Sequence, residues 1–186
     1  MTPEELESIL QGQEETQRIE FKRSVPWNEN WLAKDILAMS NVQDGGYIII
    51  GVDDPFNRLG VSQEIIETYK VDDMKDQMTK FADPHVDFSV VVQHDAGGLN
   101  YVVIHVRPFE EIPVICRKDS GETKAGTLYY RNKNRRVESA HVSNSYDMRN
   151  IIETATIKMM QRKEWQGYSV NQTTRISRLE EELDGL

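Results

Sequence analysis

The apolar run Tyr47-Ile48-Ile49-Ile50-Gly51-Val52 constrains the fold more than any other part of the chain. Residues 41–46 (N-V-Q-D-G-G) interrupt a helical pattern just before this run. Asp53-Asp54-Pro55 ends it, because two carboxylates and a proline cannot continue a buried strand. A short apolar run between such breaks is typical of a central strand that is covered on both faces. It contains a glycine and is too short to span a membrane, so we expect no membrane contact.

The pattern on either side of this strand supplies helices and further strands. Helical spacing of apolar residues is found at residues 3–12, from about Asn30 to Met39, and from about Ser145 onward. Residues 65–81 predict one broken helix or two short ones. Polar and apolar residues alternate in the remaining segments, which therefore predict strands: residues 18–22, a hairpin over 86–92 and 101–106 with its turn at 95–98, and short strands at 114–116 and 127–131.

This order of elements indicates an α/β (α+β) fold with a single mixed β-sheet and flanking helices. We place one domain at residues 1–152 and a C-terminal helical extension at residues 153–186. Leu179, Leu183 and Leu186 give that extension an apolar stripe suited to docking on a neighbour.

Charge and cysteine content narrow the functional classes. The chain carries 31 acidic residues against 22 Lys and Arg, a net charge of −9, which argues against promiscuous binding to nucleic acid. Its single cysteine, Cys116, excludes an intrachain disulfide framework and a Cys-rich zinc site. The acidic N-terminus from Glu4 onward does not resemble a signal peptide, so we expect a cytoplasmic protein.

A local basic segment is hidden by that total charge. Residues 107–136 hold eight Lys and Arg against four acids. At its end, cations, amides and aromatic rings stand together, the groups that bind phosphates and stack on unpaired bases. The candidate nucleic-acid-binding residues are Tyr130, Arg131, Lys133, Arg135 and Arg136. The alternative is a solvated loop whose long side chains reach into water.

Carboxylates form a second candidate site. Glu20 and Lys22 are two apart in a predicted strand, so their side chains leave the same face, and Asp53 and Asp54 follow the central strand. If these strands are neighbours, the carboxylates of Glu15, Glu20, Asp53 and Asp54 converge and repel unless a hard cation such as Mg²⁺ or Mn²⁺ binds between them. Such an ion activates water for phosphodiester hydrolysis, and Lys22 would bind a phosphate oxygen. The alternative is a set of solvated acids and a simple Asp-Asp-Pro turn.

Several motifs together resemble the AlbA-like domain of the Schlafen family. They occur in the family's order at residues 15–22 (E-T-Q-R-I-E-F-K), 32–41 (L-A-K-D-I-L-A-M-S-N), 45–54 (G-G-Y-I-I-I-G-V-D-D) and 129–131 (Y-Y-R). The resemblance covers roughly residues 5–152.

Some Schlafen proteins are metal-dependent endoribonucleases that cut tRNA and rRNA with two glutamates and an aspartate. The resemblance implies that Glu15, Glu20 and either Asp53 or Asp54 hold the metal, and that the substrate is structured RNA such as tRNA, in phage defence or a stress response. Nuclease members pair two lobes in one chain, whereas this chain has one, so we expect a homodimer or higher homo-oligomer.

Two other functions stay open at this stage. One is a non-catalytic nucleic-acid-binding or regulatory module, and the other is an oligomeric interaction subunit that touches no nucleic acid.

Overall fold

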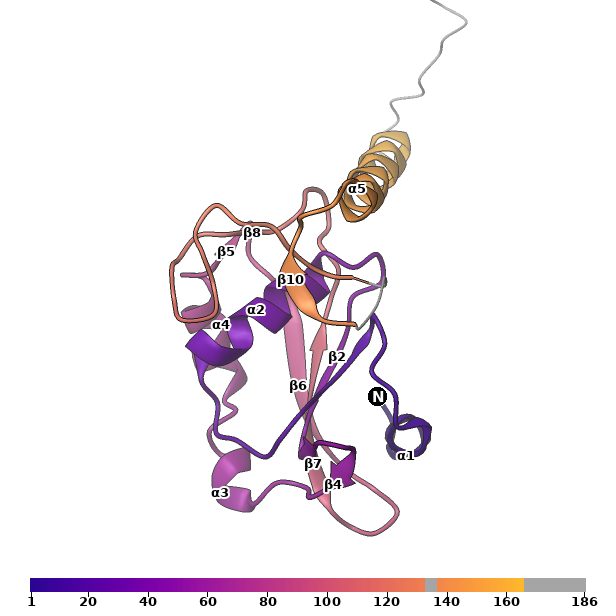
Figure 1. Ribbon diagram of the computed structural model, residues 1–186, viewed down its shortest axis with the longest axis vertical. Helices are drawn as coiled ribbons and strands as arrows, with labels where there is room; N and C mark the ends of the chain where they lie inside the picture. The colour runs from indigo at the N-terminus through magenta and orange to yellow at the C-terminus, as the bar shows by residue number, and fades with distance from the viewer. Residues whose placement is uncertain (133–136, 166–186) are drawn as a thin grey trace, which may run out of the picture.

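The computed structural model describes residues 1–132 and 137–165 (Figure 1). Its helices are α1 (Pro3–Gly12), α2 (Glu29–Ser40), α3 (Gln63–Ile66), α4 (Val71–Met78) and α5 (Ser145–Trp165). Its strands are β1 (Ile19–Lys22), β2 (Gly46–Ile50), β3 (Val52–Asp53), β4 (Asn57–Arg58), β5 (Ala82–Asp83), β6 (Phe88–His94), β7 (Asn100–Val106), β8 (Ile115–Cys116), β9 (Tyr129–Arg131) and β10 (Ser139–His141).

The apolar run that dominates the sequence becomes β2, an inner strand of a four-stranded mixed sheet with the order β1-β2-β7-β6. Strand β1 runs parallel to β2, and the other neighbours are antiparallel. In this register Ile48 lies between Glu20 of β1 and Ile104 of β7. The predicted central strand is therefore confirmed.

Helices cover both faces of this sheet (Figure 1). Ile48 and Ile50 point into the larger core beneath α2 and α4, whereas Ile49 points into a smaller core with Leu6 and Leu10 of α1. All three isoleucines are fully buried. Successive strand residues point to opposite faces, so an unbroken apolar run is what a doubly covered strand requires.

The hairpin is formed by β6 and β7, and the broken helix is α3 followed by α4. The mixed α+β fold is confirmed, but the short strands form three separate two-stranded pairs, β3–β4, β5–β8 and β9–β10. The expected domain boundary at residue 152 falls inside α5. The leucines of the expected C-terminal extension lie outside the described residues.

Among the described helices, none has the length and apolar character needed to cross a membrane.

Candidate functional site

A cleft beside β1 gathers every acidic and lysine residue that the sequence marks for catalysis. It has a volume of about 450 Å³ and is lined by Glu15, Glu20, Lys22, Asp53 and Asp54. Glu20 and Lys22 come from β1, and Asp53 ends β3, which directly follows β2. The parallel pairing of β1 with β2 is thus what brings the two parts of the sequence to one place.

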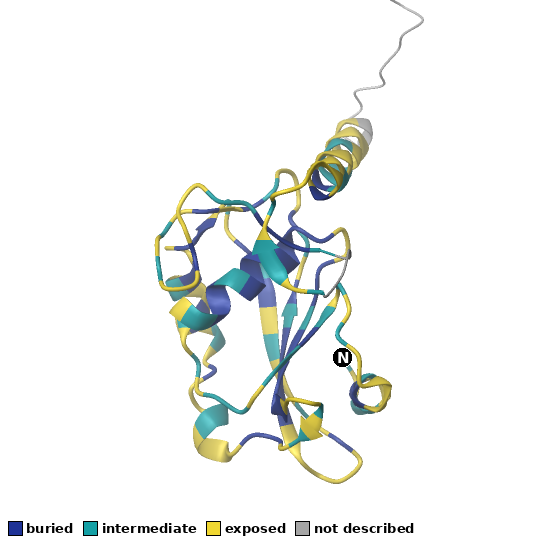
Figure 2. Ribbon diagram, in the orientation of Figure 1, coloured by how far each residue is buried: buried dark blue, intermediate teal, exposed yellow. Residues whose placement is uncertain are grey.

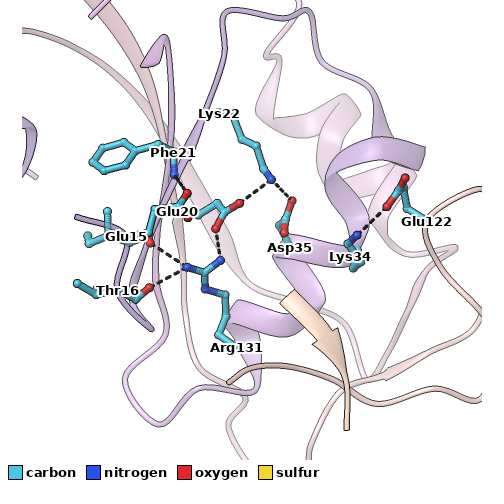
Figure 3. Close-up of polar contacts among 10 residues, drawn as sticks. Glu15, Thr16, Glu20, Phe21, Lys22, Lys34, Asp35, Glu122 and Arg131 are labelled. Atoms are coloured by element: carbon cyan, nitrogen blue, oxygen red, sulfur yellow. Dashed lines mark hydrogen bonds and ion pairs between the residues drawn. The ribbon is translucent and has the colours of Figure 1, made fainter. Parts of the chain in front are cut away.

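Glu20 and Lys22 belong to a network of ion pairs that also includes Asp35 of α2 (Figure 3). The ammonium nitrogen of Lys22 lies 2.6 Å from one carboxylate oxygen of Glu20 and 2.9 Å from one of Asp35. Burial opposes the charged form of Lys22, but the carboxylates of Asp35 and Glu20 outweigh it and raise the pKa of Lys22. Lys22 therefore stays a cation at the wall of the cleft.

The second oxygen of Glu20 is bound by Arg131, whose side chain is completely buried. The same guanidinium donates to the backbone carbonyl oxygens of Thr16 at 2.8 Å and Ile19 at 2.9 Å. Figure 3 shows Glu20 held between Arg131 on one side and Lys22 on the other. Two cations thus balance the carboxylates of Glu20 and Asp35, which makes this part of the site electrically neutral.

Glu15 stands beside this neutral network, and within residues 1–132 and 137–165 no Lys, Arg or His forms an ion pair with it. Its carboxylate accepts a hydrogen bond from the backbone N–H of Phe21 at 3.1 Å. Burial and then the negative charge of Glu20 raise the pKa of Glu15, and they outweigh the effect of the Phe21 amide. Both glutamates line the same cleft, where the charge of Glu20 disfavours the ionised form of Glu15.

Asp53 and Asp54 are exposed and line the same cleft. The backbone N–H of Asp54 donates to the Asp53 carboxylate at 3.1 Å, just before the turn at residues 54–56 that joins β3 to β4. The oxygen donors around the cleft suit Mg²⁺ or Mn²⁺ in chemical type. Within residues 1–132 and 137–165, however, no three acidic, His or Cys side chains lie close enough together to hold a metal ion. A three-carboxylate metal site is not assembled in this structure.

Aromatic side chains line the same cleft. Phe21, Trp31 and Phe56 are half-buried there, and the rings of Phe21 and Phe56 meet edge to face with their centroids 5.7 Å apart. Phe56 has a φ of 74°, a left-handed conformation that is uncommon for a bulky residue. Such strain recurs at ligand sites, and the rings offer flat apolar surface at the cleft.

The structure corrects part of the predicted basic site. Arg131 and Tyr130 are buried, and the hydroxyl of Tyr130 accepts a hydrogen bond from Gln17 at 2.9 Å. In this structure both side chains hold β9 against the rest of the protein, and neither is presented to a nucleic acid. Lys133, Arg135 and Arg136 lie outside the described residues. Val137, just beyond them, lines a second cavity together with Glu15 and Glu20.

One residue of the network, Asp35, is not among the predicted site residues, and Arg131 is predicted in a different role. Asp35 interrupts the apolar face of α2 and is 3% exposed, so a lone acid among buried positions was the available signal. The sequence indicates only the charge of Arg131, whereas its place in β9, a strand buried at all three positions, shows that it faces inward.

Fold and site together define a mixed-sheet α+β domain with an acidic and aromatic cleft at the edge of its sheet. The profile of the family described as Schlafen, AlbA_2 matches residues 15–140, and the chain belongs to that family. A comparison with curated proteins gave no match.

Two solved structures share the fold. The N-terminal domain of a RecG-related protein from Nitrosomonas europaea is 18% identical, with a TM-score of 0.51, and the alignment covers 78% of this chain and 97% of that domain. The DIP2311 protein from Corynebacterium diphtheriae is 19% identical, with a TM-score of 0.50 over 78% of this chain. This chain spans only 27% of the latter protein.

Proposed function

We propose that this chain binds RNA at the acidic cleft and cuts it as a Mg²⁺- or Mn²⁺-dependent endoribonuclease. One observation carries the proposal: a single cleft collects Glu15, Glu20, Lys22, Asp53 and Asp54 from separate parts of the sequence. Membership of the Schlafen AlbA_2 family supports an association with nucleic acid. The resemblance of the motifs supports structured RNA, such as tRNA, as the substrate.

The cleft offers groups for each part of a nucleotide. Lys22 and the exposed Arg23 are the cations beside the carboxylates, where they would bind a phosphate. The rings of Phe21, Trp31 and Phe56 would contact an unpaired base, because aromatic side chains stack on bases of any sequence. The basic residues Lys133, Arg135 and Arg136, which lie outside the described residues, would add contacts to the RNA backbone in this proposal.

In this proposal the metal ion would take oxygen ligands from Glu15, Glu20 and one of Asp53 and Asp54. A bound ion of this kind would activate water and neutralise charge on the phosphate. The ligands must draw closer together than they stand in this structure. The exposed aspartates have the room to do so, whereas Glu20 is fixed by Lys22 and Arg131.

The direct test is incubation of the full chain with a tRNA transcript and Mn²⁺, followed by gel analysis of the products. We expect metal-dependent cuts that EDTA abolishes. The double variant Asp53→Asn, Asp54→Asn should lose at least about a hundredfold in rate, because it removes one ligand while leaving the buried network intact. Glu64→Gln, an exposed acid on α3, is the matched control. Equal cutting by the double variant and the control would contradict the proposal.

A non-catalytic nucleic-acid-binding module is the second candidate, and the balanced network favours it. Both oxygens of Glu20 are already bound by cations, as in a structural ion pair. This function predicts binding that weakens as salt rises and that Arg135→Ala with Arg136→Ala weakens for all sequences alike, with no cleavage in Mn²⁺. Metal-dependent products that the aspartate variant removes would exclude it.

A further inference from the structure

The two edge strands of the central sheet, β1 and β6, differ in whether the protein itself binds their outward backbone groups. On the outer side of β1, the N–H of Phe21 is bound by the Glu15 carboxylate, and the carbonyl of Ile19 is bound by Arg131 and by the N–H of Thr16. Three of the four outward backbone groups of Ile19 and Phe21, both N–H groups and the carbonyl of Ile19, are therefore bound by the protein itself. Edge strands need such protection, because free N–H and C=O groups are a template for pairing.

The opposite edge, β6, is open. It is the terminal strand of the sheet, and no strand within the described residues pairs with its outer side. At the two ends of β6, the backbone N–H of Arg107 donates to the carbonyl of Asp87, and the N–H of Asp95 donates to the carbonyl of Leu99. These two bonds show which residues of β6 form hydrogen bonds with β7. The odd-numbered residues bond to β7, so Phe88, Val90, Val92 and His94 direct their N–H and C=O groups outward.

Strand β6 also lacks the usual defences of an edge. It has seven residues, F-S-V-V-V-Q-H, with no lysine, acid or proline among them. Val91 and Val92 are 39% and 46% exposed and point to opposite faces of the sheet. An exposed stretch is visible within β6 in Figure 2. A long, uncharged edge with exposed valines is suited to pairing with a strand of the same kind.

We propose that a second copy of this chain pairs with the β6 edge, antiparallel, about a two-fold axis at Val91. Val91 then faces the partner's Val91, and Val90 faces the partner's Val92. This register uses all four outward-facing residues of each strand, for up to about eight backbone hydrogen bonds. It joins the two four-stranded sheets into one continuous sheet.

Charge and shape favour a second copy as the occupant. Each chain carries a net charge of −9, so two copies repel overall, but β6 has no charged side chain to bring that repulsion into the seam. Helices α1 and α4 both contact β6, α1 on one face of the sheet and α4 on the other, and within the described residues no strand pairs with its outer side. The pairing is self-complementary, as a two-fold interface requires.

The dimer has a consequence for the cleft. Because the cleft lies beside β1, at the other end of the sheet order, the two clefts of the dimer lie at opposite ends of the joined sheet and both stay open. The inference rests on the edge strands alone and does not depend on the proposed nuclease function.

The test measures the mass of the full chain by light scattering and sedimentation over a concentration series. We expect twice the 21.5 kDa chain mass, and we expect Val91→Lys to raise the dissociation constant at least about tenfold, because like charges would face each other across the axis. Ile112→Lys adds the same charge at an apolar residue that is 58% exposed and outside β6, and it should leave the dimer unchanged. A monomer at all concentrations, or a dimer that Val91→Lys does not weaken, overturns the proposal.

Cysteine cross-linking tests the register. In a non-hydrogen-bonded pair the Cα atoms are about 4.5 Å apart, within the range of a disulfide, so Val91→Cys should form a covalent dimer under mild oxidation. Ser89→Cys on the same strand is the matched control, because its counterpart would lie about 13 Å away along the strand. The buried Cys116 is common to both variants. Equal cross-linking of the two variants overturns the proposed axis.

Discussion

Arg131 and Glu20 form a buried ion pair that joins β9 to β1 across 111 positions of the chain. Glu20 is thus both a wall of the candidate cleft and an anchor of the fold. A substitution at Glu20 that abolishes activity would not by itself identify a catalytic residue, because removing it leaves a buried guanidinium without its counter-charge. The exposed aspartates of the cleft do not carry this double role.

Arg131→Met should destabilise the protein by about 3–5 kcal/mol, as breaking a buried ion pair from one side does. The substitution also removes the donors to the carbonyl groups of Thr16 and Ile19. Urea unfolding followed by circular dichroism measures the loss. Arg107→Met is the matched control, because the side chain of Arg107 is 63% exposed in a surface pair with Asp87. It should cost under about 1 kcal/mol, and equal losses for the two variants would show that Arg131 is not an anchor.

Glu15 should make stability depend on pH in a defined direction. Its folded-state pKa is raised above the ordinary value of 4.5, so the folded state binds this proton more tightly than the unfolded state. The resulting stabilisation is complete below the unfolded pKa and is lost as pH rises through the folded pKa.

Glu15→Gln should therefore gain stability relative to the wild type as the pH rises from about 4 to about 7, measured by urea unfolding with a chelator present. Glutamine keeps an acceptor for the Phe21 amide. The exposed Glu14→Gln is the control for a neighbouring charge change. A stability difference for Glu15→Gln that stays constant over this range would contradict the assigned environment.

Much of the fold could be predicted from local patterns. Strand β2, the β6–β7 hairpin and helix α1 each depend on a few adjacent residues. The separate two-stranded pairs could not be predicted, because β5 and β8 are only two residues long and meet from distant parts of the chain. Pairing partners of such short strands are set by packing and leave no periodic pattern.

The residues of the cleft could be predicted as a group, but the ion pairs that they form could not. The spacing of Glu20 and Lys22 and the strand end at Asp53 predict a common site only if the two strands are neighbours, a condition that the β1–β2 pairing meets. That Arg131 and Lys22 occupy both oxygens of Glu20 depends on a contact over more than a hundred residues, which one sequence does not reveal. The same contact explains why an arginine in a basic segment faces inward.

Asn41 should be as important to stability as any core side chain. It is 1% exposed, and its amide nitrogen donates to the carbonyl oxygens of Leu37, Val114 and Tyr129. Asn41→Asp keeps the shape but replaces this donor with a carboxylate that faces those oxygens, so we expect a loss above about 3 kcal/mol in urea unfolding. The same change at the exposed Asn30 should be nearly neutral. A small loss at Asn41 would contradict the hydrogen bonds described.

Gly46 is the first residue of the central strand β2, and its substitution tests why a glycine is found there. A Cβ atom there would collide with the sulfur of Met39 and with the carbonyl oxygen of Arg18. That carbonyl cannot move freely, because it accepts the N–H of Tyr47 at 2.7 Å in the β1–β2 ladder. Gly46→Ala should cost about 1–3 kcal/mol, as overpacking does. Gly12→Ala has no atom within 4 Å of the added carbon and should be neutral or slightly stabilising in thermal unfolding. If both variants unfold at the wild-type temperature, close packing does not determine the glycine at the start of β2.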